Sequence, residues 1–208
     1  MFPSLSRVFQ RLLRSRPAAW VLPGVIAVTL ALLQLAGNGA ASVLRYDRAR
    51  ILQGNAWRLL TGHLVHADFP HLAWNLFGIV LVWALFAGEF TAGSWIAVML
   101  ASTAAIDLGF LAFEPGLEWY VGFSGVLHGL MAAGLVAWLR ERRDPLIVVV
   151  AVLFVGKLVW EHVRGPLPFT AGTLAVAVVH EAHTYGAIGG ALCAAWLLAR
   201  RSHARPSL

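Results

Sequence analysis

Long apolar segments occupy most of this chain and restrict its fold more than any other feature of the sequence. Each is close to the roughly 17–25 residues that a helix needs to cross a hydrocarbon core. Backbone polar groups in lipid must be satisfied within the protein, so several such segments fold as a bundle of helices. The segments span residues 18–36, 71–88, 93–113, 124–139, 146–162 and 174–199. They predict an all-α membrane protein with six transmembrane helices in a single domain over residues 1–208.

Charge supports a membrane setting over a nucleic-acid partner. Only 12% of the 208 residues are charged, whereas a soluble domain carries about 25%. The net charge of +6 comes mainly from arginines in short clusters between apolar segments, a pattern typical of topology signals. We therefore expect the lipid bilayer, and no nucleic acid, as a partner.

The arginine clusters also predict an orientation. They precede the first apolar segment, follow the fourth and follow the sixth: Arg7, Arg11, Arg14, Arg16, Arg140, Arg142, Arg143, Arg200, Arg201 and Arg205. With both termini in the cytoplasm, all of them lie on the cytoplasmic side, as the positive-inside rule requires. We expect an N-in, C-in bundle with a basic cytoplasmic N-terminus at 1–17 and an external loop at 37–70. A cleaved signal peptide is the alternative for the first segment, but the arginine balance favours a retained helix.

The external loop at 37–70 mixes apolar and charged residues in a helix-like rhythm. We expect it to lie at the membrane interface, with Trp57 and Leu59 as anchors.

Ser124 stands at the start of the fourth apolar segment, in the sequence GFSG. A hydroxyl at a helix start lies near free N–H groups that stabilise negative charge. Small residues recur every four positions after it, at Gly125, Gly129 and Ala133, so another helix can approach closely. A short motif of this kind, taken alone, is more commonly a helix N-cap.

His183 is the candidate general base for that serine. His183, Gly186 and Gly190 share one face of the sixth segment, so the imidazole lies on its least bulky side. Contact between two glycine faces would bring the imidazole to the serine hydroxyl, whose proton it can remove. His180, one turn earlier in the same predicted helix, is the rival base but lacks the glycine register.

His71 and Asn75 are four residues apart in the second segment and face the same way. Two donors that point into a bundle can hold the negative oxygen of a tetrahedral intermediate. As isolated residues they would more commonly be packing hydrogen bonds.

Taken together, these residues resemble the signatures of rhomboid intramembrane serine proteases, over all six predicted helices. The signatures are Trp57-Arg58 in the external loop, His71 and Asn75 in HxxxN, Gly122, Ser124 and Gly125 in GxSG, and Ala182, His183, Gly186 and Gly190 in AHxxGxxxG. The resemblance implies a Ser124–His183 dyad with an oxyanion hole formed by His71, Asn75 and the Ser124 N–H. It also implies no triad carboxylate, no metal and no cofactor. A catalytically silent rhomboid-like protein that binds membrane helices is the alternative.

His128 departs from the pattern of many rhomboids, which have a tyrosine four residues after the serine, packed on the catalytic imidazole. The run GFSGVLHG instead resembles the rhombosortase branch. That branch implies substrates with a C-terminal GlyGly-CTERM signal, which consists of a Gly-Gly pair, a transmembrane helix and a basic tail. It also implies a bacterial inner membrane, with the active site open to the periplasm.

The remaining polar residues have structural interpretations. Lys157 and Glu161 are four residues apart and are expected to pair, with a contact to a substrate tail near Glu161 and His162 as the alternative. Asp107 is expected to find a polar partner, and Cys193, the single cysteine, to pack in an apolar helix.

Two other classes of function fit the sequence less well. In the run from His180 to His183 the histidines are three residues apart, whereas the H-E-x-x-H motif of metalloproteases requires four. His63, His66 and His71 have no carboxylate or cysteine at ligand spacing that would strengthen a metal site. A transporter would commonly show repeated halves, and the chain has no such duplication.

Overall fold

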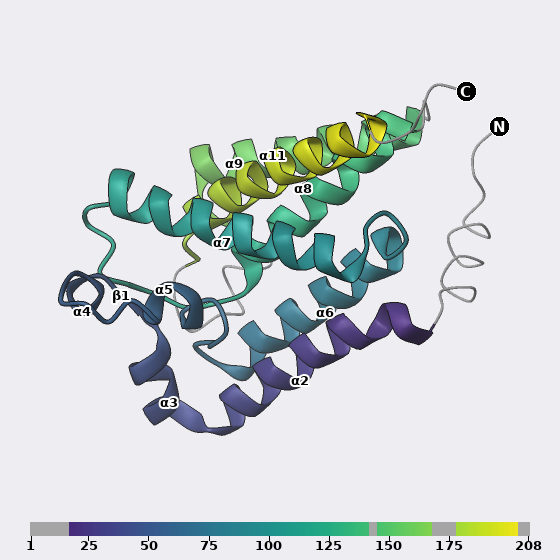
Figure 1. Ribbon diagram of the computed structural model, residues 1–208. Helices are drawn as coiled ribbons and strands as arrows, with labels where there is room; N and C mark the ends of the chain where they lie inside the picture. The colour runs from purple at the N-terminus through teal and green to yellow at the C-terminus, as the bar shows by residue number, and fades with distance from the viewer. Residues whose placement is uncertain (1–16, 142–144, 168–177, 204–208) are drawn as a thin grey trace.

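The protein is a bundle of helices with a small antiparallel sheet of two strands at one end (Figure 1). The computed structural model describes residues 17–141, 145–167 and 178–203. Its helices are η1 (Pro17–Trp20, a 3₁₀ turn), α2 (Val21–Leu35), α3 (Gly37–Leu44), α4 (Arg48–Leu52), α5 (Arg58–Thr61), α6 (Phe69–Phe86), α7 (Ala92–Phe113), α8 (Ser124–Glu141), α9 (Pro145–Arg164) and α11 (Glu181–His203). The strands β1 (Tyr46–Asp47) and β2 (Trp119–Tyr120) pair antiparallel.

Five helical segments are long and apolar enough to cross a membrane: Ala18–Leu35, Phe69–Phe86, Ala92–Phe113, Pro145–Arg164 and Glu181–Ser202. Helix α8 is not among them, although it has 18 residues, about 27 Å at the usual rise. It is less apolar because it carries polar residues at both ends, from Ser124 and His128 to Arg140. The prediction of a helical membrane bundle is therefore confirmed for the bundle and for five candidate spans.

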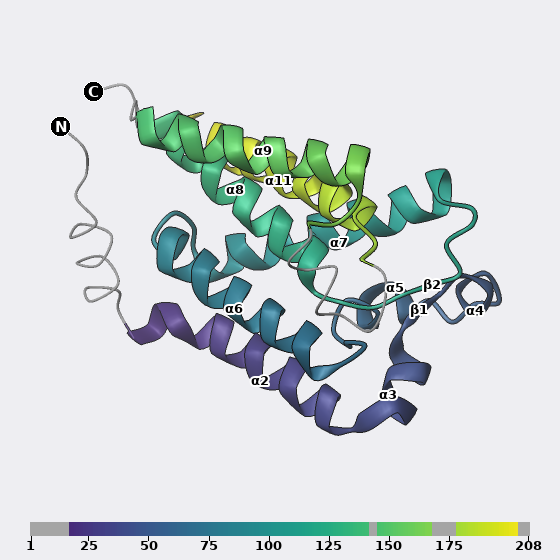
Figure 2. The ribbon, with the colours of Figure 1, turned by 180° about the vertical axis from the view of Figure 1, so that it is seen from behind.

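Helix α8 can carry polar residues because it lies at the centre of the bundle. It contacts α6, α7, α9 and α11, and it lies between α6 on one side and α9 and α11 on the other in both views (Figures 1 and 2). Its buried side chains include Val126 and Leu130, which lie in the hydrophobic core with Phe86 and Phe110. Helices α2 and α9 lie at the periphery, where many of their apolar side chains are exposed, as expected for surfaces that face lipid.

Glycines allow α8 and α11 to touch backbone to backbone. A Cβ added at Gly186 would collide with the carbonyl of Gly125, and one added at Gly190 with the backbone of Gly129. The small-residue faces predicted on the two helices therefore meet. This contact fixes the register between the start of α8 and the first turn of α11.

The 37–70 segment folds into three short helices and one strand, as its helix-like rhythm predicts. Arg58 holds this segment together, because its buried guanidinium donates from Nη1 to the carbonyls of Ser42 (3.2 Å) and Arg45 (2.8 Å). The Gly122 N–H donates to the carbonyl of Gly62 (3.2 Å), which ties the loop before α8 to the same segment. Trp57 is 52% exposed, consistent with an interface anchor.

The sixth helix begins later than predicted. The sequence suggests a helix from residue 174, but α11 begins at Glu181, residues 178–180 are not helical, and residues 174–177 lie outside the described residues. Turn hydrogen bonds from Ala182 N–H to Val179 O and from His183 N–H to His180 O start the helix. The prediction that His180 lies inside the helix is therefore wrong, since it belongs to the preceding turn.

Candidate active site

Ser124 is positioned by the strand and turn that precede α8. Gly122 has φ +124°, a conformation that side chains disfavour, and this turn leads from β2 into the helix that starts at Ser124. Tyr120 donates its hydroxyl proton to the carbonyl of Gly122 (2.8 Å). Burial raises the pKa of the Tyr120 phenol, so it stays a neutral donor. The serine is thus held at the first position of a central helix.

His183 lies in the first turn of α11, opposite that serine. Its Nε2 is 3.0 Å from the Ser124 Oγ, a hydrogen-bond distance, and the histidine is only 5% exposed. His71, Asn75, Ser124 and His183 line one cavity of about 640 Å³. A hydroxyl next to a buried imidazole in such a cavity has the arrangement of a nucleophile with its base.

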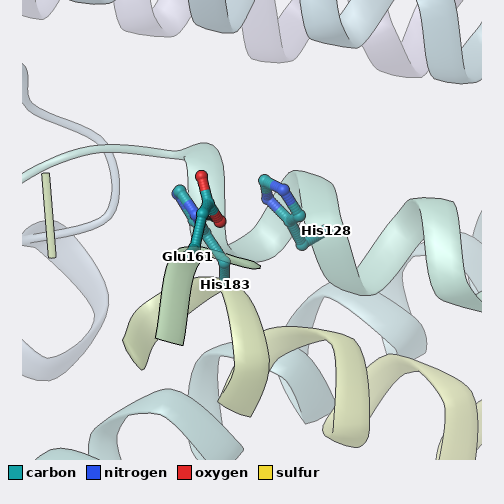
Figure 3. Close-up of side chains that lie close together, drawn as sticks. All are labelled: His128, Glu161 and His183. Atoms are coloured by element: carbon teal, nitrogen blue, oxygen red, sulfur yellow. Dashed lines mark hydrogen bonds and ion pairs between the residues drawn. The ribbon is translucent and has the colours of Figure 1, made fainter. Parts of the chain in front are cut away.

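A carboxylate lies behind the imidazole. Glu161 of α9 places Oε2 2.9 Å from the His183 Nδ1, and the close-up shows the two side chains beside each other (Figure 3). The same oxygen accepts a hydrogen bond from Lys157 (2.6 Å), so the predicted pair of Lys157 and Glu161 is confirmed. The resemblance implied no carboxylate at this position, and the structure differs from it here. Spacing along α9 predicted the ion pair but contained no signal for a contact with α11.

His128 stacks on His183, with ring centroids 4.0 Å apart and planes 17° apart. His128 thus packs on His183 from the position, four residues after the serine, at which many rhomboids have a tyrosine. The His128 Nδ1 lies 2.7 Å from the carbonyl of Ser124, and its Nε2 contacts the Lys157 ammonium. An imidazole whose Nε2 accepts from an ammonium carries its proton on Nδ1, where it donates to that carbonyl.

His128, Glu161 and His183 could between them offer ligand atoms to a metal ion, because those atoms lie within 4.8 Å of one another. The Lys157 Nζ contacts all three side chains, with 3.3 Å to the His183 Nδ1 as the longest distance. The Lys157 ammonium therefore already places a positive charge among these three side chains.

His71 and Asn75 lie on the first turns of α6, on the wall opposite α11. The side chain of Asp68 caps the helix by accepting from the His71 N–H (2.6 Å), and the Asn75 Nδ2 donates to the His71 carbonyl (3.0 Å). The His71 ring lies against Gly122, where an added Cβ would be 2.7 Å from Nε2. Gly122 is therefore required both for its positive φ and for the approach of His71 to the start of α8.

Two further buried histidines lie in the segment before α6. His66 is 2% exposed, and burial, together with the neighbouring His71 ring, lowers its pKa to about 3, so it is neutral. His63 contacts the Asp107 carboxylate (3.2 Å), so His63 is the polar partner that we expected Asp107 to have. Neither histidine lines the cavity that contains Ser124.

The cavity lies between α6 and α9 and is mainly apolar. Trp74 and Leu81 of α6, and Leu153 and Phe154 of α9, form its walls. His180 does not line it, and its Nε2 lies 3.3 Å from the Glu181 carboxylate. The structure therefore brings His183, and not its rival His180, to Ser124.

Residues 53–201, which include every residue of this site, match the sequence model of the Rhomboid domain family. The chain is 29% identical over 149 residues to the rhomboid protease GlpG of Klebsiella pneumoniae, an alignment that covers 69% of this chain and 51% of that protein. It is 27% identical over 116 residues to the rhomboid protease GluP of Bacillus subtilis, which covers 53% of this chain and 22% of that protein. The chain thus spans about half the length of the first of these relatives, and less of the second.

Proposed function

Because the chain belongs to the rhomboid family of multi-pass membrane proteins, we propose that it is a serine endopeptidase that cleaves membrane-anchored substrates within or beside the bilayer. The observation that carries this proposal is the 3.0 Å contact between the Ser124 Oγ and the His183 Nε2 in an apolar cavity. The resemblance of the surrounding residues to the signatures of rhomboid proteases supports it.

The reaction follows from the positions of these groups. The Ser124 Oγ attacks the scissile carbonyl while its proton moves to the His183 Nε2. His71, Asn75 and the Ser124 N–H, which is free at the start of α8, stabilise the oxyanion. His183 then protonates the leaving amine as the C–N bond breaks, and a water molecule hydrolyses the acyl-enzyme by the same sequence of proton transfers.

The cavity suggests how a substrate enters. An extended segment that unwinds from a membrane helix is apolar, and α6 and α9 present an apolar cavity wall beside Ser124. We propose that substrates enter between these two helices. Helix α9 is the more mobile candidate, since few of its residues are buried.

A finer substrate class follows from His128 and the rhombosortase-like run around Ser124. We propose that the protein processes C-terminal GlyGly-CTERM signals in a bacterial inner membrane, with the active site open to the periplasm. The stack of His128 on His183 supports this proposal, because an imidazole shapes the space beside the nucleophile differently from a tyrosine.

The arginine distribution supports six spans, including α8, with both termini in the cytoplasm. A reporter enzyme that is active only outside the cytoplasm should stay inactive when it is fused after Leu208. Activity of that fusion would contradict the orientation.

Purified full-length protein, reconstituted in liposomes with a membrane-anchored substrate, tests the activity. Ser124→Ala and His183→Ala should each abolish cleavage, and the double variant should be no worse, because the two residues act as one unit. His180→Ala is the matched control and should stay active. Full activity of Ser124→Ala or His183→Ala would contradict the mechanism. An inactive wild type that binds helices would favour the catalytically silent alternative.

A further inference from the structure

Helix α9 carries a charged pair whose carboxylate is buried, where charge is costly. Glu161 is 3% exposed near the end of α9, and Lys157 lies one turn before it, after a stretch of the helix that is entirely apolar. Ionised side chains inside a membrane protein are expensive unless they are paired, and they commonly serve a function. An ion pair would satisfy Glu161, but its carboxylate also contacts a residue of another helix.

That contact is to the side of His183 that faces away from the serine. One oxygen, Oε2, lies 2.9 Å from Nδ1, while Nε2 on the opposite edge of the ring lies 3.0 Å from the Ser124 Oγ. A neutral imidazole carries one proton, and only the tautomer with that proton on Nδ1 leaves Nε2 free to accept from serine. A carboxylate at Nδ1 selects this tautomer, since the other would place two acceptors against each other.

Lys157 influences whether the Glu161 carboxylate can select this tautomer of His183. Its ammonium lies 3.3 Å from Nδ1 and on its own would favour the inactive tautomer, in which Nδ1 accepts. It is closer to Glu161, at 2.6 Å, and it also donates to the His128 Nε2. Of the two groups near Nδ1, the Glu161 carboxylate at 2.9 Å is closer than the Lys157 ammonium at 3.3 Å. The ammonium supplies the positive charge that keeps this carboxylate ionised in an apolar region.

We propose that Glu161 is a positioning residue that completes a Ser124–His183–Glu161 triad, with Lys157 as its counter-ion. This inference rests on the proposed protease activity. As Ser124 attacks, its proton moves to Nε2 and His183 becomes an imidazolium, while Nδ1 keeps its own proton and Glu161 stays ionised. Glu161 thus orients the ring and stabilises its positive charge, and the proton then leaves from Nε2 to the departing amine.

The first test is Glu161→Gln in the reconstituted full-length protein. The amide cannot stabilise the imidazolium as an anion does, so kcat should fall by about 10²–10⁴-fold, the range of acid–base effects, with little change in KM. Glu161→Asp keeps the charge but shortens the side chain, so its kcat should lie between those of the wild type and of Glu161→Gln. Glu114→Gln is the matched control. Glu114, at the end of α7, accepts a hydrogen bond from Tyr185, and its substitution should leave kcat unchanged.

Two measurements separate positioning from a structural role. ¹⁵N NMR of labelled histidines should show the His183 proton on Nδ1 in the wild type and in Ser124→Ala, and redistributed in Glu161→Gln. The double variant Lys157→Met/Glu161→Gln contains no unpaired charge and should fold, yet kcat should be as low as in Glu161→Gln. Wild-type kcat in either Gln variant would overturn the triad while leaving the protease proposal intact. An inactive wild type would instead overturn the protease proposal.

Discussion

At the scale of single residues, the His183 ring is restrained on three sides. Ser124 and Glu161 contact its two nitrogens, and His128 covers one face. A ring held in this way needs little reorientation before it accepts a proton, and such preorganisation lowers the barrier to reaction. The proposed oxyanion donors come from α6 on the opposite wall of the cavity, so they can be tested independently of the base.

Removal of an oxyanion donor should affect turnover more than binding. His71→Ala and Asn75→Ala should each lower kcat, by up to about 10²–10³-fold for a strong donor, because these donors act on charge that develops in the transition state. Steady-state kinetics with a membrane-anchored substrate measures the effect. Asn38→Ala, on the exposed surface of α3, is the control. A rise in KM with unchanged kcat would contradict the assignment.

Short-range spacing explains which of these residues the sequence could predict. Serine and histidine signatures indicated Ser124 and His183, and the interval of four indicated the ion pair of Lys157 and Glu161. The contact of Glu161 with His183 joins two helices across a turn, and nothing in the spacing within either helix specifies it. Helix spacing likewise placed His180 on a turn of α11, because the sequence did not reveal that the helix begins only at Glu181.

At the scale of elements, the contact between α8 and α11 determines the geometry of the site. Glycine faces bring the two backbones together, and the same register places the first turn of α11 beside the first residue of α8. The sequence predicted this contact because glycine periodicity is local to each helix. It did not predict the pairing of β1 with β2, since strands of only two residues have no recognisable alternation.

Gly190→Ala should therefore disturb both stability and activity. The added methyl group would collide with the Gly129 backbone and force α11 away from α8, at a cost of about 1–3 kcal/mol. Thermal unfolding in detergent should shift to lower temperature, and cleavage should fall as His183 moves from Ser124. Gly156→Ala on α9 is the control, because a Cβ there meets no atom within 4 Å. An unchanged Tm and rate for Gly190→Ala would show that the helices tolerate separation.

At the scale of the whole molecule, the described helices surround Ser124, and an apolar cavity adjoins it. Helices α2, α6 and α7 lie on one side of α8, and α9 and α11 lie on the other (Figures 1 and 2). On the proposed route between α6 and α9, a substrate backbone passes apolar side chains before it reaches Ser124. The space beside Ser124 then limits which residues can stand at the cleaved bond.

That limit leads to the prediction on substrates. His128 lies one turn beyond Ser124 and is held in place by the Ser124 carbonyl and by Lys157, so it forms a fixed wall beside the nucleophile. Residues without side chains can approach such a wall closely, and glycine also leaves a helix readily, because it loses more conformational freedom than other residues when it is ordered. A Gly-Gly pair just outside a C-terminal membrane helix should therefore be cleaved efficiently.

A fusion protein that carries a Gly-Gly pair, an apolar helix and a basic tail tests this prediction beside a generic helix substrate. We expect the fusion to be cut with the higher kcat/KM. Gly→Val at either glycine should lower its cleavage by at least about tenfold, because even one extra methylene in a close-fitting pocket costs about 1–3 kcal/mol. Ser124→Ala is the inactive control for both substrates. Efficient cleavage of the generic helix together with an intact Gly-Gly tail would exclude this substrate class. The serine protease proposal would survive that result, because the contact of Ser124 with His183 does not depend on which segment enters the cavity.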